Sequence, residues 1–346
     1  MNFTKVLTNW YSINKRDLPW RNTKNPYHIW LSEIILQQTQ IKQGLPYYEA
    51  FVKNFPTVFD LASADEQDIL KLWQGLGYYS RARNLHVSAK HIANDLNGKF
   101  PKIYSEILKL KGVGDYTASA IASICFNEPT AVVDGNVYRV LSRYFGIQTP
   151  INSTQGIKEF KSLASSLIDI KNPGDYNQAI MEFGATQCKP KNPYCIVCPL
   201  SDSCVALQKS IIEVLPVKLK KTKLTKRHFN FLVFLTPDKK TIFEKRSSKG
   251  IWQNLYQFPL IETKKQLTPE DFYTLREVTS YLNGMNFKYR LFNTKELVHK
   301  LSHQHLHTRF WIIEIDKLPK DGILYSKITD YPMPKLISNF IEAFEF

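Results

Sequence analysis

Four cysteines crowd into one short segment, and this feature constrains the fold more than any other. Cys188, Cys195, Cys198 and Cys204 follow the spacing Cys-x6-Cys-x2-Cys-x5-Cys within 17 residues. Thiolates this close in sequence can converge on one site without help from the rest of the chain. Structural zinc sites usually combine two CxxC-type pairs, but this segment has one, so the spacing favours a [4Fe-4S] cluster held by four thiolates. Zinc remains an alternative.

The composition indicates a globular chain with excess positive charge. Its 346 residues exceed the usual single-domain size and predict two domains. A net charge of +15 favours a polyanionic partner such as nucleic acid, although a basic protein without one is an alternative. We find neither a membrane-length apolar run nor a signal peptide, and expect a cytoplasmic, nucleoid-associated protein with no membrane partner. Disulfides are rare in such a compartment, and Cys125, in an apolar helical run, is expected in the core.

The predicted secondary structure changes near residue 214. Apolar residues recur at helical spacing over 27–43, 61–72, 80–95, 103–110, 116–126, 136–145 and 155–169. Residues 214–227 are basic and lack acidic side chains, and whether they bind DNA or only tether is open. Beyond them, strands are predicted at 229–236, 240–246, 255–261 and 308–315, with helices at 268–283 and the C-terminus. We predict an all-α domain (1–213), a linker (214–227) and a smaller α+β domain (228–346).

A glycine-containing turn joins two of the predicted helices. Gly112, Val113 and Gly114 would form a tight turn whose backbone can approach a ligand closely. The next helix should begin near residues 115–117, so that its free N–H groups and dipole create an anion site suited to a DNA phosphate. An ordinary helix–helix turn is the alternative.

Asp134 stands 20 residues after this turn, immediately before another helical run. This position predicts an N-cap, since an aspartate there accepts bonds from the first free N–H groups. A capping aspartate also stays ionised near the helix dipole, so capping is compatible with an electrostatic role at a site.

Together these features resemble the helix-hairpin-helix DNA glycosylases of the endonuclease III superfamily. Within it, four blocks are similar to the adenine DNA glycosylases (the MutY family): LPWR at 18–21, WLSEIILQQTQ at 30–40, LWQGLGYYSRARNLH at 72–86 and VVDGNVYRVLSR at 132–143. The resemblance covers nearly the whole chain and is densest up to residue 204. It implies two helical subdomains around DNA and a catalytic pocket, then a Nudix-like domain. It also implies a monomer acting on double-stranded DNA with adenine opposite 8-oxoguanine or guanine.

Two carboxylates are the candidates for the chemistry. Hydrolysis of an N-glycosidic bond needs an acid for the leaving group and a carboxylate facing the cationic sugar. Glu33 lies in an apolar stretch where burial would raise its pKa, and Ile29, Glu33 and Gln37 would share one helix face. The resemblance assigns Glu33 the protonation of adenine N7 and later the activation of water, and Asp134 the stabilisation of the sugar. An exposed helical glutamate is the alternative.

Tyr116 separates two reaction types. In bifunctional relatives a lysine at this position attacks the sugar and forms a Schiff base. A tyrosine cannot form an imine, so we predict a monofunctional enzyme that leaves an abasic site. The resemblance places Tyr116 beside the catalytic carboxylate, and Asn136 toward the sugar–phosphate or orienting Asp134. Burial for packing alone is the alternative for Tyr116.

Base contacts follow from the same resemblance, since adenine must be flipped out of the duplex to be cut. Trp20, Arg21 and Gln178 would surround the flipped base, and Gln37 and Tyr78 would lie near the opposite base. Core packing is the alternative for Trp20 and Tyr78.

The C-terminal region contains two blocks that resemble the family's 8-oxoguanine-checking domain, KRSSKGIWQNLYQFP at 245–259 and HKLSHQHLH at 299–307. Ser302 and His303 match its reader loop, whereas Leu301 replaces the common phenylalanine. The alternating histidines could suggest a metal site, but that spacing on a strand disfavours one. Residues 276–284 carry Arg-Glu but lack the paired glutamates of a Nudix hydrolase.

Three other functions compete with this interpretation. An endonuclease III-like glycosylase/lyase acting on oxidised pyrimidines is disfavoured by Tyr116 and the extra domain. A non-enzymatic DNA-binding redox sensor would not need both Glu33 and Asp134. A nucleotide hydrolase would need the missing glutamates.

Overall fold

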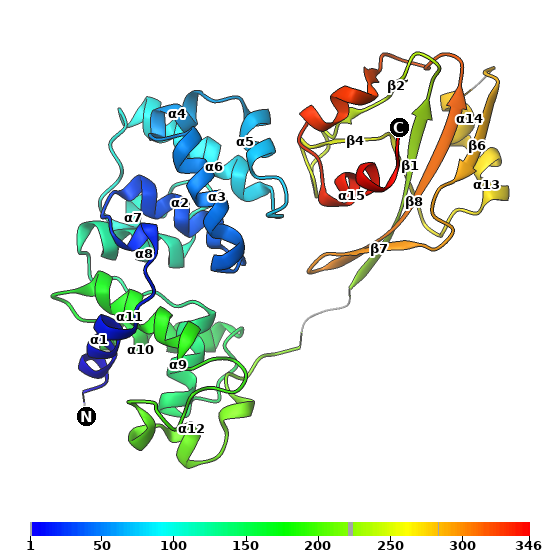
Figure 1. Ribbon diagram of the computed structural model, residues 1–346. Helices are drawn as coiled ribbons and strands as arrows, with labels where there is room; N and C mark the ends of the chain where they lie inside the picture. The colour runs from blue at the N-terminus through cyan, green and yellow to red at the C-terminus, as the bar shows by residue number, and fades with distance from the viewer. Residues whose placement is uncertain (1, 221–223, 283) are drawn as a thin grey trace. The chain divides into compact units, whose positions relative to one another are not determined.

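The computed structural model describes residues 2–220, 224–282 and 284–346 (Figure 1). The chain forms two compact units, one of Met1–Ser63 with Asn84–Lys221 and one of Ala64–Arg83 with Thr222–Phe346. The second unit therefore joins a segment of the helical region to the C-terminal sheet. The division at 213 and 228 stays a prediction, and residues 221–223 of the predicted linker lie outside the described residues.

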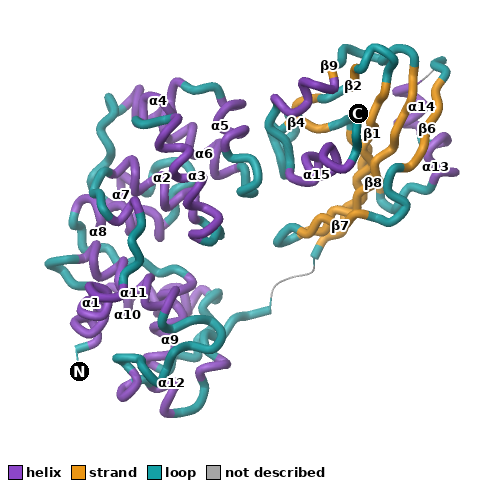
Figure 2. Tube along the Cα trace, in the orientation of Figure 1, coloured by secondary structure: helices purple, strands orange, loops and turns teal. Residues whose placement is uncertain are grey.

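The first unit is built from helices and loops (Figure 2). In chain order its elements are α1 (Phe3–Asn14), η1 (Pro19–Arg21), α2 (Pro26–Leu36), α3 (Ile41–Asn54), α4 (Val58–Ser63), most of α6 (Ser80–Lys90), η2 (His91–Asp95), α7 (Tyr104–Ile107), α8 (Asp115–Phe126), α9 (Gly135–Phe145), α10 (Thr154–Leu167), α11 (Pro173–Thr186), η3 (Ser201–Ser203), α12 (Val205–Gln208) and η4 (Ile212–Val214). This confirms the predicted all-α fold. No described helix has the length and apolarity needed to cross a membrane.

The single helix predicted over 27–43 is wrong, because α2 ends at Leu36 and α3 begins at Ile41. Gln37 leaves the helical region with ψ 114°, and Gln38 has a left-handed φ of 54°, which a helix of L-residues cannot continue. Gln37 is thus the C-cap of α2 and does not extend the helix face that carries Ile29 and Glu33.

The core of the first unit surrounds α11, which packs on α9, α1 and α8. Large apolar side chains fill this core without exposure, including Phe160, Tyr176 and Phe183. Because α8 and α9 are both anchored there, their N-termini are held in fixed positions.

The second unit contains the mixed sheet. Its elements are α5 (Glu66–Leu72), β1 (Thr225–Leu235), β2 (Lys240–Thr241), β3 (Glu244–Lys245), β4 (Tyr256–Gln257), β5 (Leu260–Thr263), α13 (Pro269–Thr274), α14 (Arg276–Leu282), β6 (Phe287–Leu291), β7 (Leu297–Lys300), β8 (Gln304–Ile315), β9 (Ile323–Leu324), η5 (Tyr325–Asp330) and α15 (Lys335–Ala343). The main sheet has the order β5-β1-β8-β6, with β7 also pairing with β8. Strands β1 and β8 are parallel, and their other pairings are antiparallel.

Helices cover both faces of this sheet (Figure 1). Phe340 of α15 stacks on Phe310 at 4.0 Å between ring centroids, and Phe272 of α13 stacks on Trp311 at 4.3 Å. The predicted α+β domain is confirmed. Three of its predicted elements are each divided, however: residues 240–246 contain β2 and β3, residues 255–261 contain β4 and the start of β5, and residues 268–283 contain α13 and α14.

Residues 64–83 attach to this sheet unit by polar contacts. Tyr79 Oη donates to Met333 O at 3.2 Å, and Arg83 Nη1 donates to Gln253 O at 2.8 Å. Asn254 Nδ2 donates to Glu66 Oε1 at 2.6 Å. These contacts join residues 66–83 to loop residues of the sheet unit that lie 170 to 254 residues away in sequence, which no local pattern predicts.

Candidate active site

Glu33, Tyr116 and Asp134 come together from three helices. Glu33 lies on α2, Tyr116 in the first turn of α8, and Asp134 at the N-cap of α9. The Glu33 and Tyr116 side chains are hydrogen-bonded, and the Asp134 charge acts on both. Tyr116 Oη also lies 3.2 Å from Met181 Sδ, so a fourth helix, α11, borders the group. The fold therefore gathers two carboxyl groups and a phenol at one place.

The environment of Glu33 favours its protonated form. Its pKa is raised to about 7, mainly by burial; the hydrogen bond with Tyr116 lowers the pKa, and the nearby Asp134 carboxylate raises it. Burial together with the two carboxylates also raises the pKa of Tyr116 well above 10. Near neutral pH, Glu33 can hold a transferable proton while Tyr116 stays a neutral phenol.

Asp134 caps α9, as its position predicts. Its Oδ1 accepts from Asn136 N and Val137 N at 2.8 Å each, and its Oδ2 accepts from Asn136 Nδ2 at 2.7 Å. Burial raises its pKa above 3.8, while these donors and the Arg139 charge favour the ionised form. The helix dipole favours the anion as well. Two carboxyls thus meet in different environments, which allows one to donate a proton while the other stays charged.

Arg139 connects this aspartate cap to the cysteine loop. Its Nη2 donates to Asn136 Oδ1 at 2.8 Å and to Gly184 O at 2.6 Å, and its Nε donates to Cys188 O at 2.7 Å. Sequence reasoning gave Arg139 no role, although its position four residues after Gly135 puts it one helical turn beyond the cap. The guanidinium fixes Asn136, which in turn holds Asp134.

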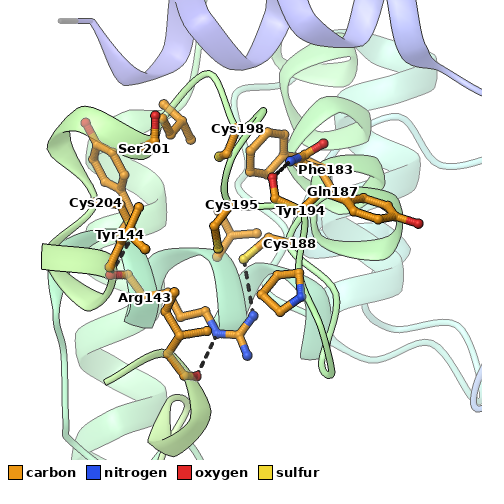
Figure 3. Close-up of a pocket in the computed structure, with 15 residues that line it drawn as sticks. Arg143, Tyr144, Phe183, Gln187, Cys188, Tyr194, Cys195, Cys198, Ser201 and Cys204 are labelled. Atoms are coloured by element: carbon orange, nitrogen blue, oxygen red, sulfur yellow. Dashed lines mark hydrogen bonds between the residues drawn. The ribbon is translucent and has the colours of Figure 1, made fainter. Parts of the chain in front are cut away.

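The four clustered cysteines line one small cavity (Figure 3). Its volume is about 30 Å³, and Cys188, Cys195, Cys198 and Cys204 all border it as free thiols. Arg143 Nη1 donates to Cys188 Sγ at 3.5 Å and to Lys189 O at 2.7 Å. Burial, followed by the charges of the other three cysteines, raises the pKa of Cys198 to about 11. Four thiolates therefore need a bound cation or metal cluster to coexist here.

The donor set bears on the choice between the two metals. Cys188, Cys195, Cys198 and Cys204 all border one cavity. Structural zinc sites with cysteine ligands usually combine two CxxC-type pairs, and this segment has one such pair, Cys195 and Cys198. A four-thiol donor set of this kind fits a polynuclear iron–sulfur cluster.

The glycine turn precedes α8 as expected. Gly112 has φ +82°, and a Cβ there would lie 2.7 Å from Asn84 Cβ, so both conformation and space require glycine. Gly114 is the N-cap residue of α8, and a Cβ there would meet no atom within 4 Å. Val113 is buried and anchors the turn. The backbone at Gly114 is therefore open to a ligand at the helix N-terminus, the geometry that suits a phosphate.

The residues predicted around the flipped base separate into two places. Arg21 and Gln178 both reach Tyr11: the guanidinium lies 5.6 Å from its ring centroid, and Gln178 Oε1 accepts from Tyr11 Oη at 3.2 Å. Arg21 also donates to Glu182 Oε2 at 2.6 Å. Trp20 is 8% exposed and packs edge-on against Tyr48 at 5.1 Å, the arrangement of a core residue.

Glu182 is an anchor that sequence reasoning missed. Its side chain is 1% exposed, and it accepts charged hydrogen bonds from Arg16 and Arg21 at 2.6–2.7 Å. Burial alone would raise its pKa, but these two arginines lower it to about 2. The only sequence signal is an isolated acidic residue in the apolar pattern of α11.

Gln37 and Tyr78, predicted near the opposite base, lie in different units. Gln37 Nε2 donates to Thr117 Oγ1 at 3.3 Å, which ties the end of α2 to the first turn of α8. Tyr78 is 46% exposed and has a left-handed φ of 47°, a strained conformation of the kind found at binding sites.

The second unit has a cavity of about 460 Å³ that collects three of the predicted residues. Tyr78 borders it from the Leu76–Tyr79 turn, and Ser302 and His303 border it from the turn between β7 and β8. Leu301 and Trp252 also line it. An aromatic ring, a hydroxyl and an imidazole thus face one space of a size that can hold a nucleobase.

The chain matches two family models. Residues 31–164 match the HhH-GPD superfamily base excision DNA repair protein, and residues 230–343 match the NUDIX domain. Among solved structures, a thermostable thymine-DNA glycosylase is 32% identical with a TM-score of 0.56, covering 60% of this chain and 95% of that one. A trapped endonuclease III–DNA intermediate, 21% identical with a TM-score of 0.53 and the same coverages, shares the fold.

Curated relatives extend the match to the whole chain. An adenine DNA glycosylase of Buchnera aphidicola subsp. Schizaphis graminum is 34% identical over 352 residues, covering 99% of both proteins. That of Buchnera aphidicola subsp. Baizongia pistaciae is 39% identical over 316 residues, covering 90% of this chain and 86% of the relative. The Homo sapiens adenine DNA glycosylase is 44% identical over 216 residues, covering 60% of this chain and 40% of the relative. The chain therefore belongs to the adenine DNA glycosylase family, the DNA N-glycosylases that remove adenine in base excision repair.

Proposed function

We propose that this enzyme flips adenine out of an 8-oxoguanine or guanine mispair, hydrolyses its N-glycosidic bond and leaves an abasic site. The observation that carries this proposal is the meeting of Glu33, Asp134 and Tyr116. One carboxyl has a pKa near neutrality, a second is held by the N–H donors of a helix cap, and no amine stands at position 116.

The chemistry divides between the two carboxyls. Protonated Glu33 would donate to adenine N7, which makes the base a better leaving group, and Asp134 would face the positive charge that develops on the sugar. The Glu33 carboxylate could then accept a proton from the attacking water. Tyr116 would hold Glu33 in place through their hydrogen bond. Arg21 and Gln178 would contact the flipped base. Trp20 would support this pocket through its packing in the core.

DNA would be held mainly through phosphates. In the Gly112–Gly114 turn, the open backbone at Gly114 and the N-terminus of α8 suit one phosphate, and the net charge of +15 favours a polyanion in general. We expect the protein to act as a monomer on duplex DNA.

The absence of an amine at position 116 predicts a monofunctional reaction. Incubation with substrate duplex and borohydride should trap no covalent adduct, because reduction captures only a Schiff base. An endonuclease III-type lyase run in parallel serves as the positive control. Tyr116→Lys tests the position directly, since an amine there could form the imine. Efficient trapping of the unmodified protein would contradict the proposal.

We further propose that the cavity bordered by Tyr78, Ser302 and His303 holds the base opposite adenine and distinguishes 8-oxoguanine from guanine. 8-Oxoguanine differs from guanine by an oxygen at C8 and a proton at N7, so a hydroxyl and an imidazole can make hydrogen bonds that guanine cannot match. Ser302 Oγ and His303 Nδ1 are 3.1 Å apart, and can therefore act as a pair.

The double variant Ser302→Ala/His303→Ala should reduce the ratio of excision rates for adenine opposite 8-oxoguanine and opposite guanine. Loss of one or two hydrogen bonds predicts a decrease of about 10-fold, while the rate opposite guanine should change little. Single-turnover assays on the two duplexes give the ratio. Ser280→Ala, at an exposed position on α14, is the matched control. An unchanged ratio in the double variant would assign recognition elsewhere.

We infer that the four cysteines hold a [4Fe-4S] cluster. The shared cavity, the free thiols and the cysteine spacing in the sequence all support it. When bound, the cluster would cross-link the loop between Cys188 and Cys204. Because Arg139 also bonds Cys188 O, that loop supports Asn136 and the aspartate cap.

Anaerobically purified protein should contain about four irons per chain and show broad visible absorption. Cys198→Ser should lose most of the iron, because its sulfur is one of four ligands, whereas Cys125→Ser should retain it, since Cys125 lies on α8 outside this cavity. Iron content by mass spectrometry decides the matter. One zinc and no iron in the unmodified protein would disprove the cluster.

A further inference from the structure

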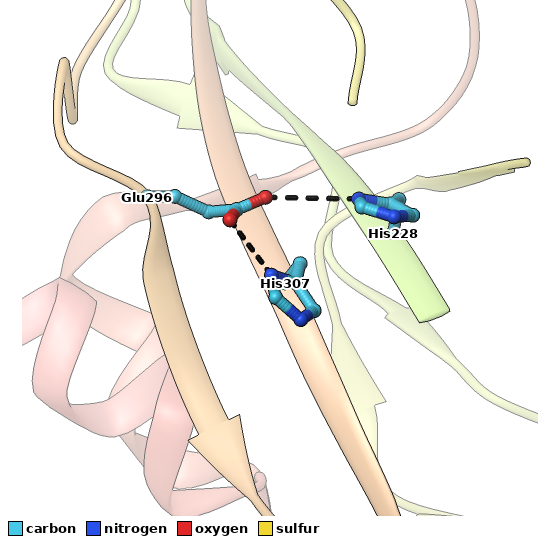
Figure 4. Close-up of side chains that lie close together, drawn as sticks. All are labelled: His228, Glu296 and His307. Carbon is cyan, nitrogen blue, oxygen red and sulfur yellow. Dashed lines mark hydrogen bonds and ion pairs between the residues drawn. The ribbon is translucent and has the colours of Figure 1, made fainter. Parts of the chain in front are cut away.

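Two histidines and a glutamate meet on the main sheet of the second unit (Figure 4). His228 on β1 and His307 on β8 are register partners in the parallel pair, with ring centroids 5.1 Å apart. Glu296, which precedes β7, places Oε1 at 3.6 Å from His228 Nδ1 and Oε2 at 2.7 Å from His307 Nδ1. Ligand atoms of all three residues lie within 4.8 Å of one another.

The cluster is incompletely satisfied by protein contacts. Among the described residues, His228 Nδ1 is buried and has no hydrogen-bond partner, although it faces Glu296. The 3.6 Å between His228 Nδ1 and Glu296 Oε1 is too long for a hydrogen bond, although the two atoms face each other. Buried polar atoms without partners are uncommon, and a cation between this nitrogen and the carboxylate would satisfy both.

We propose that His228, Glu296 and His307 bind one divalent metal ion of the zinc class. Two imidazoles and one carboxylate form a donor set that zinc uses in proteins. Bonds of about 2.0–2.1 Å at tetrahedral angles separate ligand atoms by roughly 3.4 Å. The 3.6 Å pair already fits this separation, and the 2.7 Å pair has to open by roughly 0.7 Å. Water would complete the coordination.

The ion would fasten the base of the β7–β8 hairpin. Glu296 immediately precedes β7, and His307 lies on β8. The turn between these two strands contains Leu301, Ser302 and His303. His228 adds β1, so the ion would join three segments of the sheet unit. Sequence reasoning disfavoured a metal at the alternating histidines of β7 and β8. The geometry selects only His307 from them and adds two residues from elsewhere. The site does not depend on the proposed excision chemistry.

Zinc binding to the full-length, iron-loaded protein tests the proposal. The protein is equilibrated with chelator-buffered zinc, and zinc and iron are counted together by mass spectrometry. X-ray absorption at the zinc edge then separates nitrogen and oxygen ligands at about 2.0–2.1 Å from sulfur at about 2.3 Å. Glu296→Gln and His228→Gln are the test variants. His305→Gln, two residues before His307 on β8, is the matched control.

The expected result is one zinc per chain in addition to the iron, with a nitrogen and oxygen shell. Zinc should be lost in both test variants and retained in His305→Gln. Zinc should also raise the thermal unfolding midpoint of the unmodified protein and of His305→Gln, but not of Glu296→Gln. Glutamine preserves the shape and can still accept from His307, so Glu296→Gln should fold without metal. A sulfur shell, undiminished zinc in Glu296→Gln, or no zinc in the unmodified protein would overturn the proposal.

Discussion

Glu33→Gln is expected to lower the single-turnover rate of adenine excision by about 10²–10⁴-fold, the usual contribution of a general acid. Glutamine keeps the shape of the side chain but has no transferable proton. Binding to a mispaired duplex should stay nearly unchanged, because phosphate contacts supply most of the affinity. Glu106→Gln, at an exposed position on α7, is the control and should excise adenine normally. A Glu33→Gln enzyme with near-normal turnover would show that another group is the acid.

The raised pKa of Glu33 also predicts how the activity and the stability of the protein change with pH. With a folded-state pKa of about 7, the proton-donating form is lost as pH rises through 7, so kcat/KM should fall there. The pKa of Glu33 is higher in the folded protein than its ordinary value of 4.5. The part of the free energy of unfolding that depends on neutral Glu33 is therefore fully present below about pH 4.5, and it is lost as pH rises through about 7. The difference between a pKa of 4.5 and one of about 7 corresponds to about 3 kcal/mol. Glu33→Gln should therefore be more stable than the unmodified protein at pH 8, although it is inactive.

Asp134→Asn is expected to reduce excision by about 10²–10³-fold, the loss typical when one electrostatic contact to a transition state is removed. Asparagine caps helices as well as aspartate does, and its oxygen can still accept from Asn136 N and Val137 N. The variant therefore isolates the negative charge from the capping role. Single-turnover excision and thermal unfolding, measured together, separate the two.

Asp169→Asn provides the comparison for this variant. Asp169 Oδ1 also accepts from two backbone N–H groups, those of Lys171 and Asn172, but Asp169 is half-buried and borders no helix N-terminus at the candidate site. Its excision rate should equal that of the unmodified protein. If Asp134→Asn excised adenine normally while remaining folded, the carboxylate would have no role facing the sugar. If Asp134→Asn were partly unfolded, its excision rate per folded molecule should still be lower than that of the unmodified protein.

The features that the sequence predicts correctly depend on residues close together in the chain. The capping role of Asp134 follows from its own side chain and the next three residues. The spacing from Cys188 to Cys204 is short enough for the loop itself to gather the sulfurs around one cavity. Helical and strand periodicity likewise separates the all-α region from the α+β region. The chain leaves the helix at Gln37 and Gln38, and the apolar periodicity gives no sign of this turn. The sequence therefore misplaced the end of α2.

The active-site environment was decided only by tertiary structure. The sequence shows an apolar stretch around Glu33, but its raised pKa requires burial against α8 and the approach of Asp134 from 101 residues away. Arg139, Glu182 and the placement of Tyr78 beside Ser302 also depend on contacts between distant segments. Desolvation and Coulomb interactions depend on what surrounds a group in space, and only the packed chain defines those surroundings. For the same reason, His228 on β1, His307 on β8 and Glu296 just before β7 meet with no spacing that would have marked them as a set.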